Sequence, residues 1–247
     1  MLVFSPAAIS LDLRTCTAPA PSAEVKVAHI IDGDTVTLSN GDKLRLIGVD
    51  TPELGNHKNA PETGATLARS YLSELLNKKT RYHVLYGQQK RDKYHRLLGH
   101  LFLRDGTNIQ ALLLARGLAL PLTIPPNSRL ADCYNEYAQQ AIDKEIGLWA
   151  LPEKKITFIN RLSENTRGYR RIQGQVSGIS ESASSIWINF GPTFAARIQR
   201  KDLIYFHNLD LFALENATLE VRGHVYRRNK QSRMRLSHSV DLIIHKK

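Results

Sequence analysis

The sequence predicts an α+β protein in which two small β-barrels follow each other along the chain and the first barrel carries three helices. Two observations support this prediction. Strand-like and helical segments share the chain up to about residue 150, whereas five strand-like segments dominate the remainder. Residues 160–247 also carry a net charge of +8 out of the total of +11, so the two parts differ in surface character. The 247 residues include 42% hydrophobic and 23% charged side chains, a composition typical of globular proteins, not disordered ones.

The first part begins with a pattern of short strands. Segments 25–31, 35–38 and 43–49 are rich in β-branched and alternating apolar residues, and Asn40-Gly41 between the last two favours a hairpin. Segments 80–86 and 97–103 are the next expected strands. Because the early strands are joined by hairpins, we expect a small antiparallel barrel with helices packed on it.

Three segments with helical periodicity cover this barrel. Segment 62–77 has apolar residues from Leu67 to Leu76 on one stripe. Segment 109–116 is preceded by Asn108, a favourable N-cap, and followed by Gly117. Segment 130–146 is the third expected helix. The expected domains are an N-terminal arm (1–23), an α+β domain (24–151), a linker (152–159) and an all-β domain (160–247).

The all-β domain is expected to have strands at 171–179, 185–190, 193–199, 218–226 and 233–243. Five strands in about 85 residues fit a small Greek-key barrel of the oligonucleotide-binding (OB) type, the alternative being another small barrel. Arginines recur along these strands and alternate with aromatic residues, a pattern typical of proteins that bind single-stranded nucleic acid. The aromatic residues are Tyr169, Trp187, Phe190, Phe194 and Tyr226. The alternative is that they form the core and that the arginines are only a solvated surface.

Residues 1–10 and the two cysteines indicate the compartment in which the protein functions. Residues 1–10 are mildly apolar and end in Ala8-Ile9-Ser10, which has the small-x-small form of a signal-peptidase site. We interpret them as the remnant of an export signal, the alternative being an ordinary frayed terminus. In an exported protein, Cys16 and Cys133 are expected to form a disulfide, and the protein is expected to be periplasmic or secreted. In a cytosolic protein both would be buried or inert thiols.

Acidic and basic side chains of the first domain have the composition of a phosphodiesterase site. Asp32, Asp34 and Asp50 come near expected strand ends, where their oxygens could hold a hard cation such as Ca²⁺. Arg45 and Arg96 are planar cations suited to binding phosphate. Metal, base and guanidinium groups together serve phosphodiester hydrolysis.

Each of these features also has a plain structural interpretation. An Asp-Gly-Asp sequence is usually a turn, and Asp50-Thr51-Pro52-Glu53 is also a good helix N-terminus. Arginines on a strand or in a basic loop are usually only solvated. The turn is not an EF-hand, because Lys43 stands where the bidentate Glu would be required.

Taken together, the motifs resemble the thermonuclease (staphylococcal nuclease-like) family over residues 24–150. The matching segments are IDGDT (31–35), LRLIGVDTPE (44–53), RDKYHRLLGHLF (91–102), GLAL (117–120) and GLW (147–149). The resemblance implies a five-stranded barrel with three helices. It also implies a Ca²⁺-dependent nuclease that acts on DNA and RNA with little sequence preference and leaves 3′-phosphate and 5′-hydroxyl ends.

The resemblance also implies residue roles. Asp34, Asp50 and the Thr51 carbonyl correspond to metal ligands, and Asp32 to a ligand that acts through water. Glu53 corresponds to the residue usually assigned as general base, and Arg45 and Arg96 to the arginines that bind phosphate. Lys93 and Tyr94 correspond to residues that contact a terminal phosphate.

The chain departs from the family pattern at three places. Residues 120–124 (LPLTI) lack the tyrosines that stack on a base, which puts base preference in doubt. His95 stands where Gly is frequent, and the loop at 54–61 differs in length and composition.

Three functions are therefore compared. We expect a nuclease that acts on nucleic acid and prefers single strands. We expect the protein to be a monomer. The alternative is a catalytically silent nucleic-acid-binding protein on a nuclease-like scaffold. Attraction to a membrane surface is least favoured, because the sequence lacks both an amphipathic basic helix and an apolar run of 18 residues.

Overall fold

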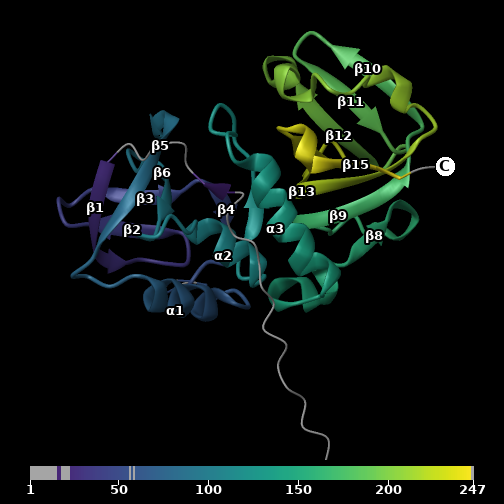
Figure 1. Cartoon of the computed structure of the whole chain (residues 1–247). Helices are drawn as coiled ribbons and strands as arrows, with labels where there is room; N and C mark the ends of the chain where they lie inside the picture. Colours follow the sequence, from purple (N-terminus) through teal and green to yellow (C-terminus); the bar gives the residue numbers. More distant parts are fainter. Residues whose placement is uncertain (1–15, 18–22, 56, 58, 246–247) are drawn as a thin grey trace, which may run out of the picture.

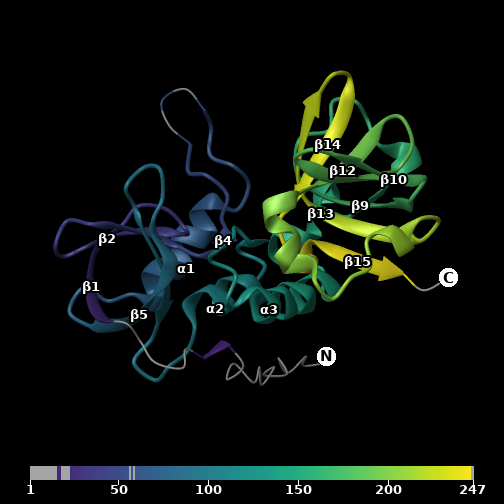
Figure 2. The same cartoon turned by 90° about the horizontal axis from the view of Figure 1, so that it is seen from above.

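The computed structural model describes residues 16–17, 23–55, 57 and 59–245, which form two β units with helices between them (Figure 1). Figures 1 and 2 both show helix α3 (Ala131–Asp143) between the first barrel and the second sheet. The expected export-signal remnant at 1–10 lies outside the described residues. No helix in the described part of the chain is long and apolar enough to cross a membrane.

The first unit is a closed barrel, as expected. Its five strands are β1 (Ala23–Ile30), β2 (Thr35–Leu38), β3 (Lys43–Leu46), β5 (Arg81–Arg91) and β6 (Leu97–Phe102). They follow the order β1-β2-β3-β6-β5 around the barrel. The expected antiparallel arrangement is wrong at one pair, because β3 and β6 are parallel. Val36, Leu44 and Leu101 are fully buried inside it, which explains the alternation along these strands.

The third expected strand, 43–49, is broken near its end. It is divided into β3 and a short β4 (Gly48–Asp50), and β4 pairs with β7 (Leu120–Leu122) away from the barrel. Gly48 has a φ of +87°, and a Cβ there would lie 2.3 Å from the Tyr134 ring. Only glycine fits this bend. The bend carries Asp50 out of the barrel to the domain's edge.

The three expected helices are present and shorter than expected. They are α1 (Ala65–Leu75), α2 (Ile109–Ala115) and α3. The Asn108 side chain caps α2 by accepting a 2.9 Å hydrogen bond from the Ala111 backbone N–H. Cys16 and Cys133 are joined by a disulfide, which confirms the expected pairing and attaches the N-terminal segment to α3.

The second unit is an all-β sheet of eight strands. They are β8 (Ile156–Phe158), β9 (Gly168–Gln175), β10 (Gly178–Ser182), β11 (Ser185–Asn189), β12 (Phe194–Gln199), β13 (Thr218–Arg228), β14 (Gln231–Leu236) and β15 (Leu242–His245). Their order is β10-β11-β12-β14-β13-β9-β8, and β15 also pairs with β13. The parallel β12–β14 pair repeats the parallel β3–β6 pair of the first barrel. Since only two residues separate β9 from β10, the connectivity is that of an OB-like barrel whose first strand is bent.

Several expected strands of this unit are interrupted. The segments 171–179 and 233–243 are each divided into two strands, and β8 lies within the segment expected to be the linker. Of the five aromatic residues noted above, Tyr169, Phe190 and Phe194 are buried. Trp187 and Tyr226 are partly exposed, so only these two could stack on a base.

Specific side chains join the two units. Trp149 of 3₁₀ helix η2 (Gly147–Ala150) meets Tyr169 of β9 edge to face, with ring centroids 6.0 Å apart. Arg222 of β13 donates a 2.8 Å hydrogen bond to Gln139 of α3. Glu220, buried beside it, accepts hydrogen bonds from both Arg171 and Arg222. The buried charges are therefore paired, as buried charges must be.

Candidate active site

The candidate site begins at the turn between β1 and β2, where Asp34 is almost completely buried. Asp34 Oδ2 accepts hydrogen bonds from the Thr51 backbone N–H (2.8 Å) and hydroxyl (3.0 Å). Asp32 supports the turn by accepting a 3.0 Å hydrogen bond from the Asp34 backbone N–H. These bonds attach the turn to the chain that follows β4.

Arg45 of β3 joins the acidic residues of this region. Its Nε lies 3.1 Å from Asp34 Oδ1, and its Nη2 lies 3.1 Å from Asp50 Oδ1. Nη1 donates to the carbonyls of Leu46 (2.8 Å) and Val49 (2.7 Å), within the segment that bends at Gly48. The guanidinium group is thus held in one orientation by bonds to all three nitrogens.

Asp50 is contacted from the second unit as well as the first. His224 of β13 places Nε2 3.2 Å from Asp50 Oδ2. Burial alone raises the pKa of Asp50, but the hydrogen bond with His224 and the charge of Arg45 bring it below its ordinary value. Asp50 is therefore held as a carboxylate.

The pKa values of Asp34 and Glu53 are raised, whereas that of Asp50 is lowered. Burial raises the pKa of Asp34 to about 6, with further repulsion from Asp32 and Asp50, although Arg45 opposes the shift. Burial also raises the pKa of Glu53, and the charges of Asp32 and Asp50 add to this effect. Asp32 and Asp50 are thus close enough to repel both Asp34 and Glu53. A bound cation would relieve this repulsion.

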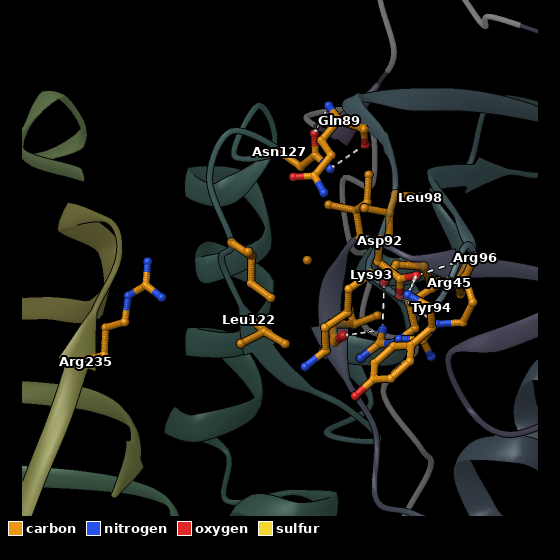
Figure 3. Close-up of a pocket in the computed structure, with 15 residues that line it drawn as sticks. Arg45, Gln89, Asp92, Lys93, Tyr94, Arg96, Leu98, Leu122, Asn127 and Arg235 are labelled. Carbon is orange, nitrogen blue, oxygen red and sulfur yellow. Dashed lines mark hydrogen bonds and ion pairs between the residues drawn. The ribbon is translucent and has the colours of Figure 1, made fainter. Parts of the chain in front are cut away.

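A cavity of about 580 Å³ is lined by Arg45, which also contacts Asp34 and Asp50, although these two carboxylates are not part of its lining. Figure 3 shows Arg45, Lys93, Tyr94 and Arg96 on one side of it, and Arg235 of β14 on the opposite side. Both arginines expected to bind phosphate therefore face the same cavity. Leu122 and Ile124 line it where the family pattern has tyrosines, so this wall is apolar but not aromatic.

The turn between β5 and β6 presents Arg96. Asp92 accepts bonds from the backbone N–H (2.9 Å) and Nε (2.7 Å) of Arg96, and these bonds lower the pKa of Asp92 although burial opposes them. His95 has a φ of +63°, the left-handed conformation that glycine adopts readily. The substitution of His for Gly therefore leaves the turn in place. Tyr94 packs under the cations, with Lys93 Nζ 4.9 Å and Arg96 Cζ 5.5 Å from its ring centroid.

The structure thus brings together most of the residues that the sequence indicated. Asp34, Asp50 and Thr51 meet around Arg45, while Lys93, Tyr94 and Arg96 share the cavity with Arg45. Among the described residues, no group of three or more His, Cys, Asp or Glu side chains is arranged as a complete metal site. The expected donor set has two directly binding carboxylates, with a carbonyl and water making up the remainder.

Sequence reasoning missed the contributions of the second unit. A further cavity of about 480 Å³ lies between the units, with Asp50 and Thr51 on one side and Arg170 and His224 on the other. Lys154 of η3 (Pro152–Lys154) also lines it, and burial together with the charge of Arg170 lowers the pKa of Lys154. Arg235 belongs to the arginines that recur along the strands of the second domain, but no local pattern placed it or His224 at this site, because the docking of the two units brings them there.

A family model described as staphylococcal nuclease homologue matches residues 43–151, which contain β3 to η2 and most of the candidate site. Asp32 and Asp34 precede the matched segment. The second unit lies outside it.

Similar proteins include several nucleases. The thermonuclease of Staphylococcus intermedius is 29% identical over 126 residues, which cover 50% of this chain and 74% of that protein. Endonuclease YncB of Bacillus subtilis (strain 168) is 31% identical over 130 residues, 51% of this chain and 61% of YncB. The SPbeta prophage-derived endonuclease YokF of the same strain is 28% identical over 131 residues, 51% of this chain and 44% of YokF. The chain thus spans only part of the length of YncB and YokF.

Proposed function

The chain belongs to the family of staphylococcal nuclease homologues, and from this premise we propose that it is a Ca²⁺-dependent nuclease. It hydrolyses phosphodiester bonds of DNA or RNA with little sequence preference and leaves 3′-phosphate and 5′-hydroxyl ends. The observation that carries the proposal is the bridging position of Arg45. This arginine contacts Asp34 and Asp50 and faces the same cavity as Arg96. A phosphate in that cavity would therefore lie beside the two guanidinium groups, and Arg45 would link it to Asp34 and Asp50.

The donor set fits a hard divalent cation. Asp34 and Asp50 offer carboxylate oxygens, the Thr51 carbonyl offers a third donor, and Asp32 can act through water. The raised pKa of Asp34, caused by burial and by Asp32 and Asp50, supports this assignment because a cation at this place offsets both costs. When bound, a divalent cation offsets the negative charge of the phosphodiester and polarises it toward attack.

The chain's own residues supply the remaining functions. Arg45 and Arg96 bind phosphate oxygens and stabilise the charge that grows on them during attack. Arg45 contacts Asp50 and Arg96 contacts Asp92, so a phosphate bound by both arginines would replace part of these contacts. Glu53, whose pKa is raised by burial and by Asp32, is suited to accept a proton from the attacking water.

The remaining side chains of the cavity hold the substrate. Lys93 and Tyr94 bind a terminal phosphate, and the Leu122–Ile124 wall offers apolar contact without aromatic stacking. We expect little base preference and weak binding of mononucleotides, because stacking on an aromatic ring contributes about 1–3 kcal/mol per base. The disulfide between Cys16 and Cys133 supports the further proposal that the protein functions in an oxidising compartment, periplasmic or extracellular.

The test is hydrolysis of single-stranded DNA by the full chain in Ca²⁺, Mg²⁺ and EDTA, followed by analysis of the product ends. We expect cleavage in Ca²⁺ and none in EDTA. Arg45→Ala and Glu53→Gln should each lower kcat by about 10²–10³, the usual effect of removing a group that acts in the transition state. Arg161→Ala, which removes an exposed arginine of η4 (Ile159–Arg161) distant in sequence from the site, is the control.

Two results would contradict the proposal. One is cleavage that continues in EDTA, and the other is full activity of Glu53→Gln and Arg45→Ala. Tight, salt-sensitive binding without cleavage in any divalent cation would instead support the catalytically silent binding protein.

A further inference from the structure

A row of side chains crosses the outer face of the second sheet and ends at the candidate active site. Trp187 of β11 pairs with Arg197 of β12, and Arg197 pairs with Arg235 of β14. Met234 pairs with Val225, so Arg235 is the neighbour of His224 on β13. Since His224 contacts Asp50, the row leads from an acidic residue of the site to Trp187.

The far end of the row is a cationic aromatic platform. Arg233 lies with its Cζ 4.7 Å from the Trp187 ring centroid, and Arg197 with its Cζ at 5.4 Å. Such cation–π contacts hold the ring and the guanidinium groups together on the surface. Trp187 remains partly exposed on β11, unlike Trp149, the other tryptophan of the chain, which is only 1% exposed.

The charges of this platform have no acidic partner. Arg197 donates to Ser185 Oγ (2.7 Å), and Arg233 donates to Gln231 Oε1 (3.0 Å), both neutral groups. Within the described residues, neither arginine has a carboxylate oxygen within 4.0 Å, whereas Arg171 and Arg222 are paired with buried Glu220. Arg197 and Arg233 therefore keep their positive charge available for an anion.

The near end of the row opens into the active-site cavity. Arg235 is held by a 2.8 Å bond to the buried Asp202 and lines the cavity opposite Lys93 and Tyr94 (Figure 3). A smaller cavity of about 270 Å³ joins Arg235 and His224 to Leu122 and Ile124 of the first domain. The row and the active-site cavity thus share walls.

We propose that this row is the path of a single-stranded nucleic acid that leaves the active site, with one base stacked on Trp187. Phosphates are bound by Arg197, Arg233 and Arg235. Neighbouring strands lie about 4.8 Å apart, so the row from His224 to Trp187 extends roughly 15 Å. At about 3.4 Å per nucleotide in a stacked strand, this length corresponds to roughly four nucleotides. A duplex is a poor fit, because the stacking platform needs an unpaired base. This inference deepens the proposed function and rests on it for the position of the scissile bond.

The test measures binding without cleavage, in EDTA. The intrinsic fluorescence of the full chain is titrated with (dT)₃, with (dT)₁₂ and with a 12-base-pair duplex. We expect (dT)₁₂ to quench the fluorescence and to bind at least tenfold more tightly than (dT)₃ and the duplex. Trp187→Phe should lose most of the quenching, since buried Trp149 is then the remaining tryptophan.

Variants measured by a labelled-oligonucleotide assay provide an independent readout. Trp187→Ala should weaken binding of (dT)₁₂ by about five- to hundredfold, the range expected for one stacked base, and should leave (dT)₃ unchanged. Arg197→Ala with Arg233→Ala should lower the slope of log Kd against log salt by about 1.4. Arg161→Ala, an equal change of charge per residue outside the row, is the control.

Unchanged fluorescence on addition of (dT)₁₂, or equal affinity of Trp187→Ala and the parent for (dT)₁₂, would overturn the inference. A duplex that binds as tightly as (dT)₁₂ would overturn the choice of a single strand. Because these measurements involve no hydrolysis, the absence of nuclease activity would contradict the proposed function and leave the binding result intact.

Discussion

Replacing Asp34 with Asn should stabilise the metal-free protein although it removes a proposed metal ligand. The side chain is almost completely buried, and burial raises its pKa to about 6 from an ordinary value of 3.8. Each pKa unit corresponds to about 1.4 kcal/mol, so keeping Asp34 ionised at pH 7.5 costs about 3 kcal/mol. Asn has the same shape and no charge, and it loses about 1 kcal/mol of hydrogen bonding to Thr51.

The pH dependence follows from the direction of the shift. A folded-state pKa above the unfolded value means that the folded protein binds the proton more tightly between pH 3.8 and about 6. The stability that protonated Asp34 contributes is therefore complete below pH 3.8 and is lost as the pH rises through 6. Relative to the parent, Asp34→Asn should gain about 2 kcal/mol above pH 6.5, and this gain should disappear toward pH 4.

The assay is urea unfolding of parent and Asp34→Asn in EDTA at several pH values between 4 and 8. Asp143→Asn, an exposed position at the end of α3, is the matched control and should change little. Added Ca²⁺ should stabilise the parent and not Asp34→Asn, because a ligand stabilises only the state that binds it. A variant that is less stable than the parent in EDTA at pH 7.5 would refute the argument that burial and repulsion dominate at Asp34.

Three further predictions concern stability. Cys133→Ala should lower the free energy of unfolding by about 2–5 kcal/mol. Reductant should lower the urea midpoint of the parent but not that of this variant. Equal urea midpoints of parent and variant without reductant would contradict a stabilising disulfide. Glu220→Gln should lower the free energy of unfolding by about 3–5 kcal/mol in the same assay, because it leaves the buried Arg171 and Arg222 without a carboxylate. A decrease of less than about 1 kcal/mol would contradict this prediction. Burial lowers the pKa of His100 to about 4, so the stability it contributes is present above pH 6.5 and is lost as the pH falls toward 4. His100→Asn should therefore lose less stability over that interval than the parent, and an equal loss in both would contradict the assignment.

Local patterns accounted for most of the fold of the first domain. The helical stripes and the Asn108 cap predicted three helices at the correct places, with ends that are too long by a few residues. The break between β3 and β4 was not expected, because residues 43–49 are apolar enough for one strand and the need for glycine at position 48 comes from its positive φ and from the Tyr134 ring, which is distant in sequence. In the second unit, the strands at 171–179 and 233–243 were expected to be continuous, whereas residues 176–177 divide the first and a segment with the 3₁₀ helix η7 (Ser239–Asp241) divides the second.

In the candidate site, too, contacts between neighbouring segments could be predicted from the sequence, whereas contacts between the two units could not. Asp34 lies in the turn before β2 and Arg45 lies on β3, so their proximity follows from the hairpin that the sequence indicates. Asp50 lies on β4 and comes near them through the bend at Gly48, which the sequence did not indicate. His224 and Arg235 reach the site only because the second unit docks on the first through contacts such as Trp149 with Tyr169. Such docking depends on complementary surfaces formed by distant segments, which periodicity and short motifs do not reveal.

The most direct test is a crystal structure of the full chain with Ca²⁺ and a nucleoside 3′,5′-bisphosphate. We predict one cation in contact with carboxylate oxygens of both Asp34 and Asp50, and a phosphate bound by Arg45 and Arg96 in the cavity they share. A cation bound away from these two carboxylates, or a phosphate that contacts neither arginine, would contradict the nuclease assignment of this site.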